Sequence, residues 1–539
     1  MDNNNKNDDV KKPYEYDECT LRAICSTSQP LSDIHEVILL HLKELSFYLL
    51  ELKTMGATNE LMRQCLLDAL SIILTNVQLK EEQYAELILS LDKNISETKK
   101  KYFELCKEQD KAPHFLKTCF KHKKDLSLAK GIKKGEKYIQ EKNSVLTHSQ
   151  KNLFDITLMI LKSTYIRAFE LKSLGEDPHD ICSALLLMLN SMNFLDTPAE
   201  KIKETIEENS TIFYELLNRL IVKKEELYGK MDEHETSFST IPGRKAIMVV
   251  GCNIKELELV LQATEGKDID VYTHGLDMLM AHTFPKLREY KHLVGHFGQC
   301  RDNALMDFVT FPGSILMTRH AVQKSEYIYK GRLFTTDLLA QRGVTKIYNN
   351  DYQPLIDAAL SAKGFRKGQK RPPMKIGFNE EALTAKVNEV LDKMEDGEIK
   401  QLYIVGLLNY ERVHKEYFDK FFKLLPKDCF VFSLAYNKSG KNIVHLDSIF
   451  DYTVICKILQ TLSKRRPIKE IDMSVFLTNC NRHTVASTIN LKKLGVKNIF
   501  MSKCHPNLAN PTLIKTMKDT FGINEFFDPK EDIEKTQAG

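Results

Sequence analysis

The hydrophobic pattern of this chain changes its period near residue 240. Before that point, apolar residues recur three and four positions apart, as in residues 37–50, and the apolar stripe stops near Gly56. After it, short β-branched runs alternate with stretches of helical spacing. A helical period does not suit a strand, so the pattern predicts a helical part followed by α/β parts.

The helical part contains two similar segments. Residues 51–56 are Glu-Leu-Lys-Thr-Met-Gly, residues 170–175 are Glu-Leu-Lys-Ser-Leu-Gly, and a leucine-rich helix is predicted after each. We interpret residues 27–236 as a helical domain of two duplicated bundles, because each copy offers amphipathic helices that must pack on one another. Cys65 and Cys182 lie on the apolar faces of these helices, where a thiol usually packs as a small apolar group.

Two breaks divide the rest of the chain. Residues 237–243 are polar and contain a Pro-Gly pair, and residues 363–373 are rich in Gly, Lys, Arg and Pro. They predict one α/β domain over residues 244–375 and another over residues 398–530, both Rossmann-like with largely parallel sheets. The predicted strands are residues 246–250, 269–272, 314–317 and 346–348 in the first domain, and 401–406, 429–434, 473–477 and 498–501 in the second.

Charge and composition exclude several classes of protein. Basic residues number 77 and acidic residues 73, and the formal charge of +4 is too small to indicate a nucleic-acid partner. No apolar run is long enough to cross a bilayer, and the first 20 residues contain no apolar leader, so we expect a cytoplasmic protein without a membrane partner. We interpret residues 1–26 as an N-terminal segment that carries a pair of cysteines. The lysine-rich residues 99–142 fit a solvated helical face or, alternatively, a docking site for an acidic electron carrier.

The twelve cysteines are not the disulfide framework of a small secreted domain; in a reducing compartment they are apolar core residues, metal ligands or redox thiols. The chain has no GxGxxG, P-loop, CxxC, HExxH or GxSxG motif, so we expect no nucleotide cofactor and no zinc-ribbon, metalloprotease or hydrolase site. Cys252, His274, Cys480 and Cys504 instead follow predicted strands. Ligands gather at the carboxyl ends of parallel strands, so these residues predict a site between the two α/β domains.

Segments spread along the chain carry a family resemblance. They are, in chain order, Cys19-Thr20 to Cys25, residues 42–48, Gly251-Cys252-Asn253, Thr264-Glu265-Gly266, Thr273-His274-Gly275, Phe311-Pro312-Gly313 and residues 494–497. In this order and spacing they resemble the hybrid-cluster (prismane) proteins over almost the whole chain, with the carbon monoxide dehydrogenases as more distant relatives. The resemblance implies a helical domain of two bundles followed by two α/β domains.

Two metal centres are implied by this resemblance. Members of the family carry a cubane [4Fe-4S] cluster near the N-terminus, held by four cysteines. They also carry a hybrid Fe–S–O cluster between the domains, bound by one histidine, two glutamates and four cysteines. The associated reactions are the reduction of hydroxylamine to ammonia and the reduction of nitric oxide, so the resemblance implies an iron–sulfur oxidoreductase.

Most of the ligand positions differ in this chain. In the cubane motif only the last two cysteines match, as Cys19 and Cys25. At the hybrid cluster, Cys252 stands at the histidine, Asp277 at the first glutamate and Asn481 at the second. The four cysteine positions correspond to Ala321, Leu407, Tyr436 and Ile449. Alanine, leucine and isoleucine side chains cannot coordinate iron, so we predict that the usual hybrid cluster is not assembled.

The cubane has three alternatives. A [4Fe-4S] cluster needs four donors, and a symmetric homodimer places the same two cysteines on both sides of its axis. Two chains could therefore share one cluster through Cys19 and Cys25, as related carbon monoxide dehydrogenases do. Alternatively the pair binds no cluster, or Cys106 or Cys119 completes the set within one chain.

The changed residues could also form a rebuilt site between the α/β domains. Sulfur, imidazole and carboxylate ligands together suit iron or zinc, whereas isolated cysteines in α/β cores usually only pack. The candidates are Cys252, His274, Asp277, Cys300, Cys480 and Cys504, with His282, His296, His320 and His505 near enough in sequence to contribute or else structural.

Three functions stay open on the sequence. The first is an iron–sulfur oxidoreductase similar to hydroxylamine reductase. The second is a non-catalytic protein that keeps one cluster for electron transfer or redox sensing. The third is a metal or thiol site without iron–sulfur chemistry, and the sequence identifies neither the substrate nor the electron donor.

Overall fold

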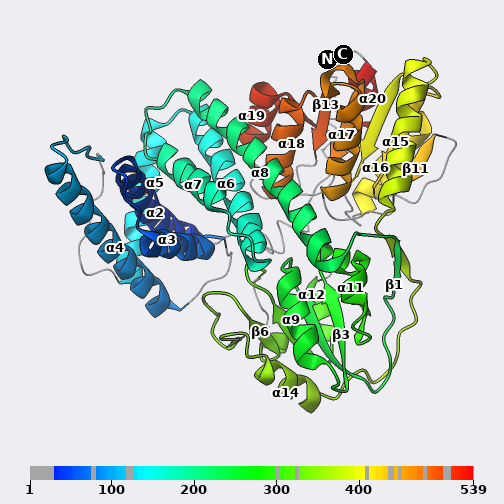
Figure 1. Cartoon of the computed structure of the whole chain (residues 1–539), viewed down its shortest axis with the longest axis horizontal. Coiled ribbons are helices and arrows are strands. Elements are labelled where there is room, and N and C mark those ends of the chain that lie inside the picture. Colours follow the sequence, from blue (N-terminus) through cyan, green and yellow to red (C-terminus); the bar gives the residue numbers. More distant parts are fainter. Residues whose placement is uncertain are drawn as a thin grey trace, which may run out of the picture.

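Three regions follow one another along the chain and are separated in Figure 1 by colour: a helical region from blue to cyan, a first sheet region in green and a second from yellow to red. This computed structural model describes residues 29–74, 80–116, 127–298, 304–321, 327–406, 412–434, 442–446, 452–477, 482–501 and 511–537. The predicted order of a helical part followed by parallel-sheet α/β parts is confirmed.

The helical region is built around two long helices. Its described elements are α2 (Gln29–Thr54), α3 (Glu60–Ile72), α4 (Glu81–Glu108), α5 (Leu128–Val145), α6 (His148–Ser173), α7 (His179–Ser191) and α8 (Ala199–Tyr228). Helix α2 packs against α3, α4, α5 and α7, and α6 packs against α7 and α8. Both α2 and α6 end near a glycine with positive φ, Gly56 and Gly175, a conformation that lets glycine terminate a helix without strain. These helices bury a continuous core of leucine and isoleucine side chains.

The first sheet has six parallel strands in the order β4-β3-β2-β5-β6-β7. They are β2 (Lys245–Val250), β3 (Ile269–His274), β4 (Leu293–His296), β5 (Ser314–Met317), β6 (Leu333–Thr335) and β7 (Thr345–Lys346). The chain adds β3 and β4 on one side of β2 and then returns to add the other strands on the opposite side. The carboxyl ends of β2 and β5 therefore meet where the strand order reverses, which is the place where open α/β sheets bind ligands.

The second sheet repeats this order as β11-β10-β9-β12-β13-β14, again with parallel pairing throughout. Its strands are β9 (Gln401–Val405), β10 (Cys429–Ser433), β11 (Ile443–His445), β12 (Met473–Leu477), β13 (Asn498–Met501) and β14 (Ile523–Glu525). Here the order reverses between β9 and β12. The loops that follow these two strands, residues 407–411 and 478–481, lie outside the described part of the chain.

Helices of the helical region contact both sheet regions. Helix α18 (Arg482–Lys493) packs on α6 and α8, and Asn152 of α6 donates a hydrogen bond to the carbonyl oxygen of Thr512 at 2.9 Å. Strand β1 (His234–Thr236) pairs antiparallel with β8 (Met374–Ile376), so the connections into and out of the first sheet lie together. Figure 1 shows α8 running from the helical region to the edge of the green sheet region.

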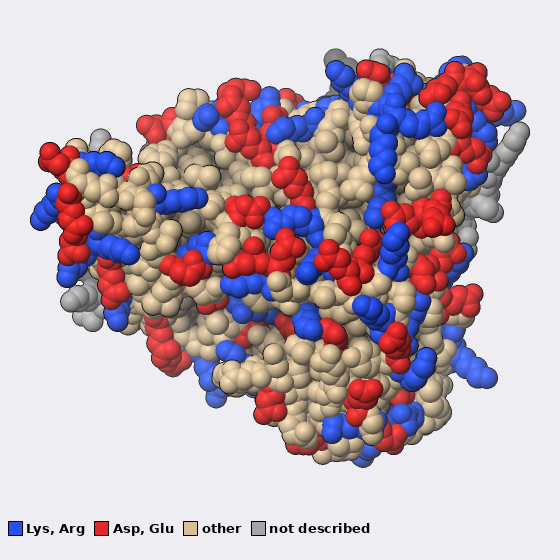
Figure 2. All heavy atoms as spheres, in the orientation of Figure 1, with Lys and Arg blue, Asp and Glu red and all other residues tan. Residues whose placement is uncertain are grey.

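The described helices differ from membrane-spanning helices in length or hydropathy. Within the ranges given above, no helix combines the length and apolar character needed to cross a bilayer. On the face drawn in Figure 2, acidic and basic side chains are interspersed, as the formal charge of +4 leads one to expect.

Candidate functional site

The carboxyl end of β2 is closed by a tight contact with the loop after β5. Gly251 has a φ of +134°, and a Cβ atom there would lie 2.0 Å from Thr318 Oγ1 and 2.7 Å from the Cβ of Ala321. Glycine is therefore needed for the close approach of these two loops. Thr318 donates a hydrogen bond to the carbonyl oxygen of Val250 at 3.1 Å, which fixes the loop. Ala321, at a predicted sulfur position, presents a methyl group next to the turn that carries Cys252.

Cys252 has a protonated thiol. Its side chain is partly buried and packs against the apolar core. Burial raises the pKa of the Cys252 thiol to about 12; the charges of Asp277 and Glu170 raise it further, while those of Arg167 and Lys224 lower it. Because the thiolate is the nucleophilic and metal-binding form, the thiol of the chain by itself is unreactive at neutral pH.

Four charged side chains surround Cys252 and alternate in sign. Arg167 of α6 pairs with Asp277 of the short helix α10 (Leu276–Leu279) at 3.2 Å and with Glu170 at 2.7 Å. Lys224 of α8 pairs with the other oxygen of Glu170 at 2.7 Å. We call Arg167, Glu170, Lys224 and Asp277 the charge network. It joins the helical region to the carboxyl edge of the first sheet.

Glu170 is the buried centre of the charge network. Burial by itself would raise the pKa of the Glu170 carboxyl, but the charges and hydrogen bonds of Lys224 and Arg167 outweigh burial and hold the pKa below its usual value. The carboxylate is therefore ionised at neutral pH. A buried anion of this kind is stable only with its partners in place.

His274 contacts a partner other than Cys252 in the described structure. It is the last residue of β3 rather than the residue after the strand, and its Nε2 lies 3.1 Å from Oδ2 of Asp307 on α12 (Ala304–Thr310). Its ring stacks on that of His296, with centroids 6.1 Å apart and planes at 12°. Cys252 and Asp277 therefore lie close enough to interact electrostatically, whereas His274 contacts Asp307.

The other candidate histidines that the structure describes, His282, His296 and His320, make contacts typical of structural residues. The hydroxyl of Thr273 lies 2.8 Å from both His282 Nε2 and His296 Nδ1, so it can donate to one ring and accept from the other. Burial lowers the pKa of His282 to about 3 and that of His296 well below its usual value, which keeps both rings neutral. The His320 ring packs edge-on against Phe169, with centroids 4.8 Å apart.

A second polar network, partly buried, joins the helical region to the first sheet. Arg319, after β5, pairs with Asp68 of α3 at 3.1 Å, and its guanidinium lies over the ring of Phe169 at 4.3 Å. Glu256 of α9 (Ile254–Thr264) accepts hydrogen bonds from the backbone N–H of Arg319 at 3.3 Å and from the hydroxyl of Thr336. Burial raises the pKa of Glu256 to about 7, even though these hydrogen bonds lower it.

This raised pKa predicts a pH dependence of stability. The folded state binds the Glu256 proton below pH 7, whereas the unfolded chain binds it only near pH 4.3, so the Glu256 contribution to stability rises as the pH falls between these values. Between pH 7.5 and 5.5 we expect wild type to gain about 2 kcal/mol relative to Glu256→Gln in urea unfolding. The comparison with the variant is essential, because buried histidines that stay neutral in the folded state, such as His282, lower the stability of the protein as the pH falls over the same range. Parallel pH profiles for the two proteins would contradict this prediction.

Several predicted ligands lie outside the described residues. They are Cys19, Cys25, Cys119, Cys300, Cys480, Cys504 and His505, together with Leu407, Tyr436, Ile449 and Asn481. Among the residues that the structure does describe, no three His, Cys, Asp or Glu side chains are close enough to hold a metal ion. The described part of the site is therefore an ion-pair network around a neutral thiol.

Comparison with known proteins identifies the family of this scaffold. The model of the prismane/CO dehydrogenase family matches residues 15–449. The chain belongs to this family. The resemblance of the chain to the hybrid-cluster (prismane) proteins is thereby confirmed.

Relatives of this prismane-family chain match it along nearly its whole length. A protein named hydroxylamine reductase from Thermodesulfovibrio yellowstonii is 29% identical over 542 residues, covering 96% of this chain and 97% of the relative. Another of the same name from Rhodospirillum rubrum is 26% identical, covering 96% of both. One similar solved structure is of acetyl-CoA synthase/carbon monoxide dehydrogenase, with NiZn[Fe4S4] and NiNi[Fe4S4] clusters in its alpha subunits. The match covers 95% of this chain and 83% of the chain in that structure. Its TM-score is 0.50 at 11% identity, a likeness that shows the fold alone.

The charged side chains that contact the strand-end residues could not be predicted from the sequence. Arg167, Lys224 and Asp307 are not expected from any strand-end or motif rule. One signal is present in the sequence: Arg167 and Glu170 lie three residues apart in a helix whose other residues from 164 to 171 are mostly apolar. A buried i, i+3 ion pair of this kind indicates a polar contact that lies beyond the helix itself.

Proposed function

We propose that this prismane-family chain is an iron–sulfur redox protein that keeps the scaffold of its hydroxylamine reductase relatives but not their hybrid cluster. The observation that supports this is the charge network. At the strand ends where the resemblance places cluster ligands, Asp277 is paired with Arg167. Ala321, at one of the sulfur positions, offers no donor atom.

The described residues do not fit the hybrid cluster for three reasons. Iron–sulfur clusters are held by thiolates, and here one sulfur position is a methyl group. The carboxylate at the first glutamate position is engaged by Arg167, so binding a cation would cost that ion pair. In addition, no three His, Cys, Asp or Glu side chains of the described residues are close enough to hold a metal ion. We therefore derive no chemistry through that cluster in this chain.

For the cubane we propose one [4Fe-4S] cluster shared by two chains of a cytoplasmic homodimer, with Cys19 and Cys25 from each. The alternative that Cys106 completes a set within one chain has less support. Cys106 is buried in α4 among the side chains of Phe47, Tyr48, Leu52 and Tyr102, where it packs as an apolar residue.

The scaffold we propose has two duplicated helical bundles and two Rossmann-like domains.

With one cluster and no hybrid site, electron transfer or redox sensing is the function that we infer for the chain. A rebuilt metal or thiol site is the second candidate. It is favoured by the position of Cys252 at the point where the strand order of the first sheet reverses. Cys300, Cys480 and Cys504 would have to supply its other ligands.

Anaerobic purification followed by iron and acid-labile sulfide analysis tests the proposal. We expect about four irons per dimer, because one cubane holds four. Cys19→Ser should remove them, since it takes away two of the four proposed donors in the dimer. Cys65→Ser, the same chemical change at a partly buried cysteine of α3, is the matched control and should retain the iron.

Two outcomes of this experiment would contradict the proposal. Protein that stays free of iron after cluster reconstitution would exclude the shared cubane. Additional iron that survives Cys19→Ser, together with hydroxylamine reduction that Cys252→Ala abolishes, would show a second cluster with catalytic function. The expected result in the hydroxylamine assay with a chemical reductant is no turnover above the reductant alone.

A further inference from the structure

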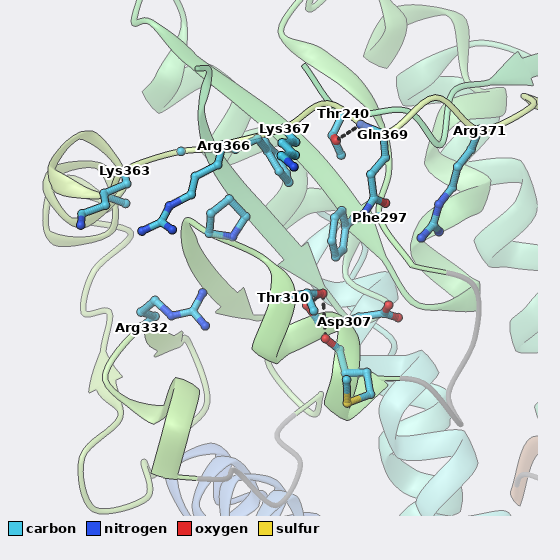
Figure 3. Close-up of a pocket in the computed structure, with 15 residues that line it drawn as sticks. Thr240, Phe297, Asp307, Thr310, Arg332, Lys363, Arg366, Lys367, Gln369 and Arg371 are labelled. Carbon is cyan, nitrogen blue, oxygen red and sulfur yellow. Dashed lines mark hydrogen bonds between the residues drawn. The ribbon is translucent and has the colours of Figure 1, made fainter. Parts of the chain in front are cut away.

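A cleft of about 740 Å³ opens on the first sheet region, away from Cys252 and Arg167. One side is the connecting segment 362–371, and the other is formed by α12 and the residues that follow it (Figure 3). We call it the basic cleft. Its volume lies within the range of roughly 300–1,000 Å³ that is typical of small-molecule sites.

Positive charge dominates the lining of the basic cleft. The segment contributes Lys363, Arg366, Lys367 and Arg371, and none of these side chains has an acidic partner among the described residues. Among the described lining residues the one carboxylate is that of Asp307, which already contacts His274 at 3.1 Å. Unpaired like charges around one cavity repel each other, and a bound anion would relieve that repulsion.

Arg332 gives the cleft a cation that is fixed in position. Its guanidinium donates hydrogen bonds to the carbonyl oxygens of Phe308 at 3.0 Å, Val309 at 3.4 Å and Gly313 at 3.2 Å, and also to that of Phe311, so both terminal nitrogens are engaged. These acceptors are neutral, so they orient the group without cancelling its charge. Figure 3 shows Arg332 and Arg366 on opposite sides of the cleft, and the Arg332 guanidinium is held against the backbone of residues 308–313.

An apolar wall lies next to these cations. The buried rings of Phe297 and Phe365, with centroids 6.0 Å apart, line the cleft together with Pro312. In Figure 3 the Phe297 ring lies between Gln369 and the Asp307–Thr310 turn. A ligand that fills the cleft therefore meets cations on one part of its surface and apolar side chains on another.

We infer that the basic cleft binds a small organic phosphate, with its phosphate groups between Arg332 and Arg366 and its organic part against Phe297. The guanidinium of Arg366 can bind phosphate through paired hydrogen bonds, whereas Arg332 and the lysines add positive charge. The volume of about 740 Å³ suits a small molecule, whereas a nucleic-acid backbone would need an extended groove. This inference goes beyond the proposed redox function and does not depend on the iron content of the protein.

Isothermal titration of the full chain with adenosine diphosphate and with pyrophosphate at low ionic strength tests the inference. We expect both to bind, and adenosine diphosphate to bind more tightly because it also contacts the apolar wall. Arg366→Gln should weaken binding about tenfold, which is the loss of one charge-assisted hydrogen bond of about 1.5 kcal/mol. Asp307→Asn should strengthen binding, since it removes the one negative charge from the described lining.

Lys370→Gln is the matched control. Lys370 is exposed on the same segment but does not line the cleft, so its loss should change affinity by less than about twofold. Equal weakening by Arg366→Gln and Lys370→Gln would overturn the inference, because it would show only diffuse attraction. Absence of binding of both probes, or tighter binding of a single-stranded oligonucleotide than of adenosine diphosphate, would overturn it as well.

Discussion

Replacement of Glu170 with glutamine is expected to lower the free energy of unfolding by about 3–5 kcal/mol, the cost typical of breaking a buried ion pair from one side. Glu170 is buried and pairs with Arg167 and with Lys224, each at 2.7 Å. The variant keeps both buried cations but removes the carboxylate between them. Urea unfolding of wild type and variant at pH 7 measures the difference.

The pH dependence of this difference has a definite sign. Lys224 and Arg167 hold the pKa of Glu170 below its usual value despite burial, so its stabilising contribution is complete above the unfolded-state pKa of about 4.3. It is lost as the pH falls through the folded-state pKa. The difference between wild type and Glu170→Gln should therefore shrink in acid.

A surface ion pair provides the control for Glu170→Gln. Glu176 pairs with Arg219 at 2.6 Å, but both side chains are about one-third exposed. Glu176→Gln is expected to cost less than about 1 kcal/mol, as is usual for exposed pairs. If the two variants cost the same, the charge network would not be a buried structural unit, and its role as a replacement for cluster ligands would lose its support.

Several strands of both sheets are predictable from the sequence. Residues 314–317, 473–477 and 498–501 coincide with β5, β12 and β13, because strands covered on both faces are continuous apolar runs. The sequence analysis misses β4, β6, β11 and β14. Each of these has at most two consecutive apolar residues, whereas β5, β12 and β13 have three, and they become strands because a neighbouring strand supplies hydrogen-bond partners.

The candidate site is predictable only on its sheet side. The rule that ligands collect at strand ends identifies Cys252 and His274, and the family resemblance identifies Asp277 and Ala321. Arg167 and Lys224 come from helices far away in sequence. Lys224 reaches Glu170 because α8 packs on α6, and Arg167 reaches Asp277 because α6 approaches α10. No local sequence pattern encodes that packing, so the ion pairs around Cys252 can be identified only from the three-dimensional structure.

Gly251→Ala should cost about 2–5 kcal/mol of stability, the sum of backbone strain at positive φ and overpacking. At a φ of +134°, the added methyl would meet Thr318 Oγ1 at 2.0 Å and the Cβ of Ala321 at 2.7 Å. Thr318 can rotate its hydroxyl away, but the Ala321 methyl is attached directly to the backbone and cannot. Urea unfolding measures the loss, and Gly266→Ala is the control, because Gly266 has a φ of +71° with open space around it.

A compensating substitution separates the clash from the strain. Ala321→Gly removes the obstructing methyl, so the double variant Gly251→Ala/Ala321→Gly should recover the part of the loss that exceeds the cost of Gly266→Ala. Recovery would show that the β2 and β5 loops are in contact through these two positions. A double variant no more stable than Gly251→Ala would place Ala321 away from the turn of Cys252. That result would reopen the space beside Cys252 for a ligand, and with it the case for a metal centre at the edge of the first sheet.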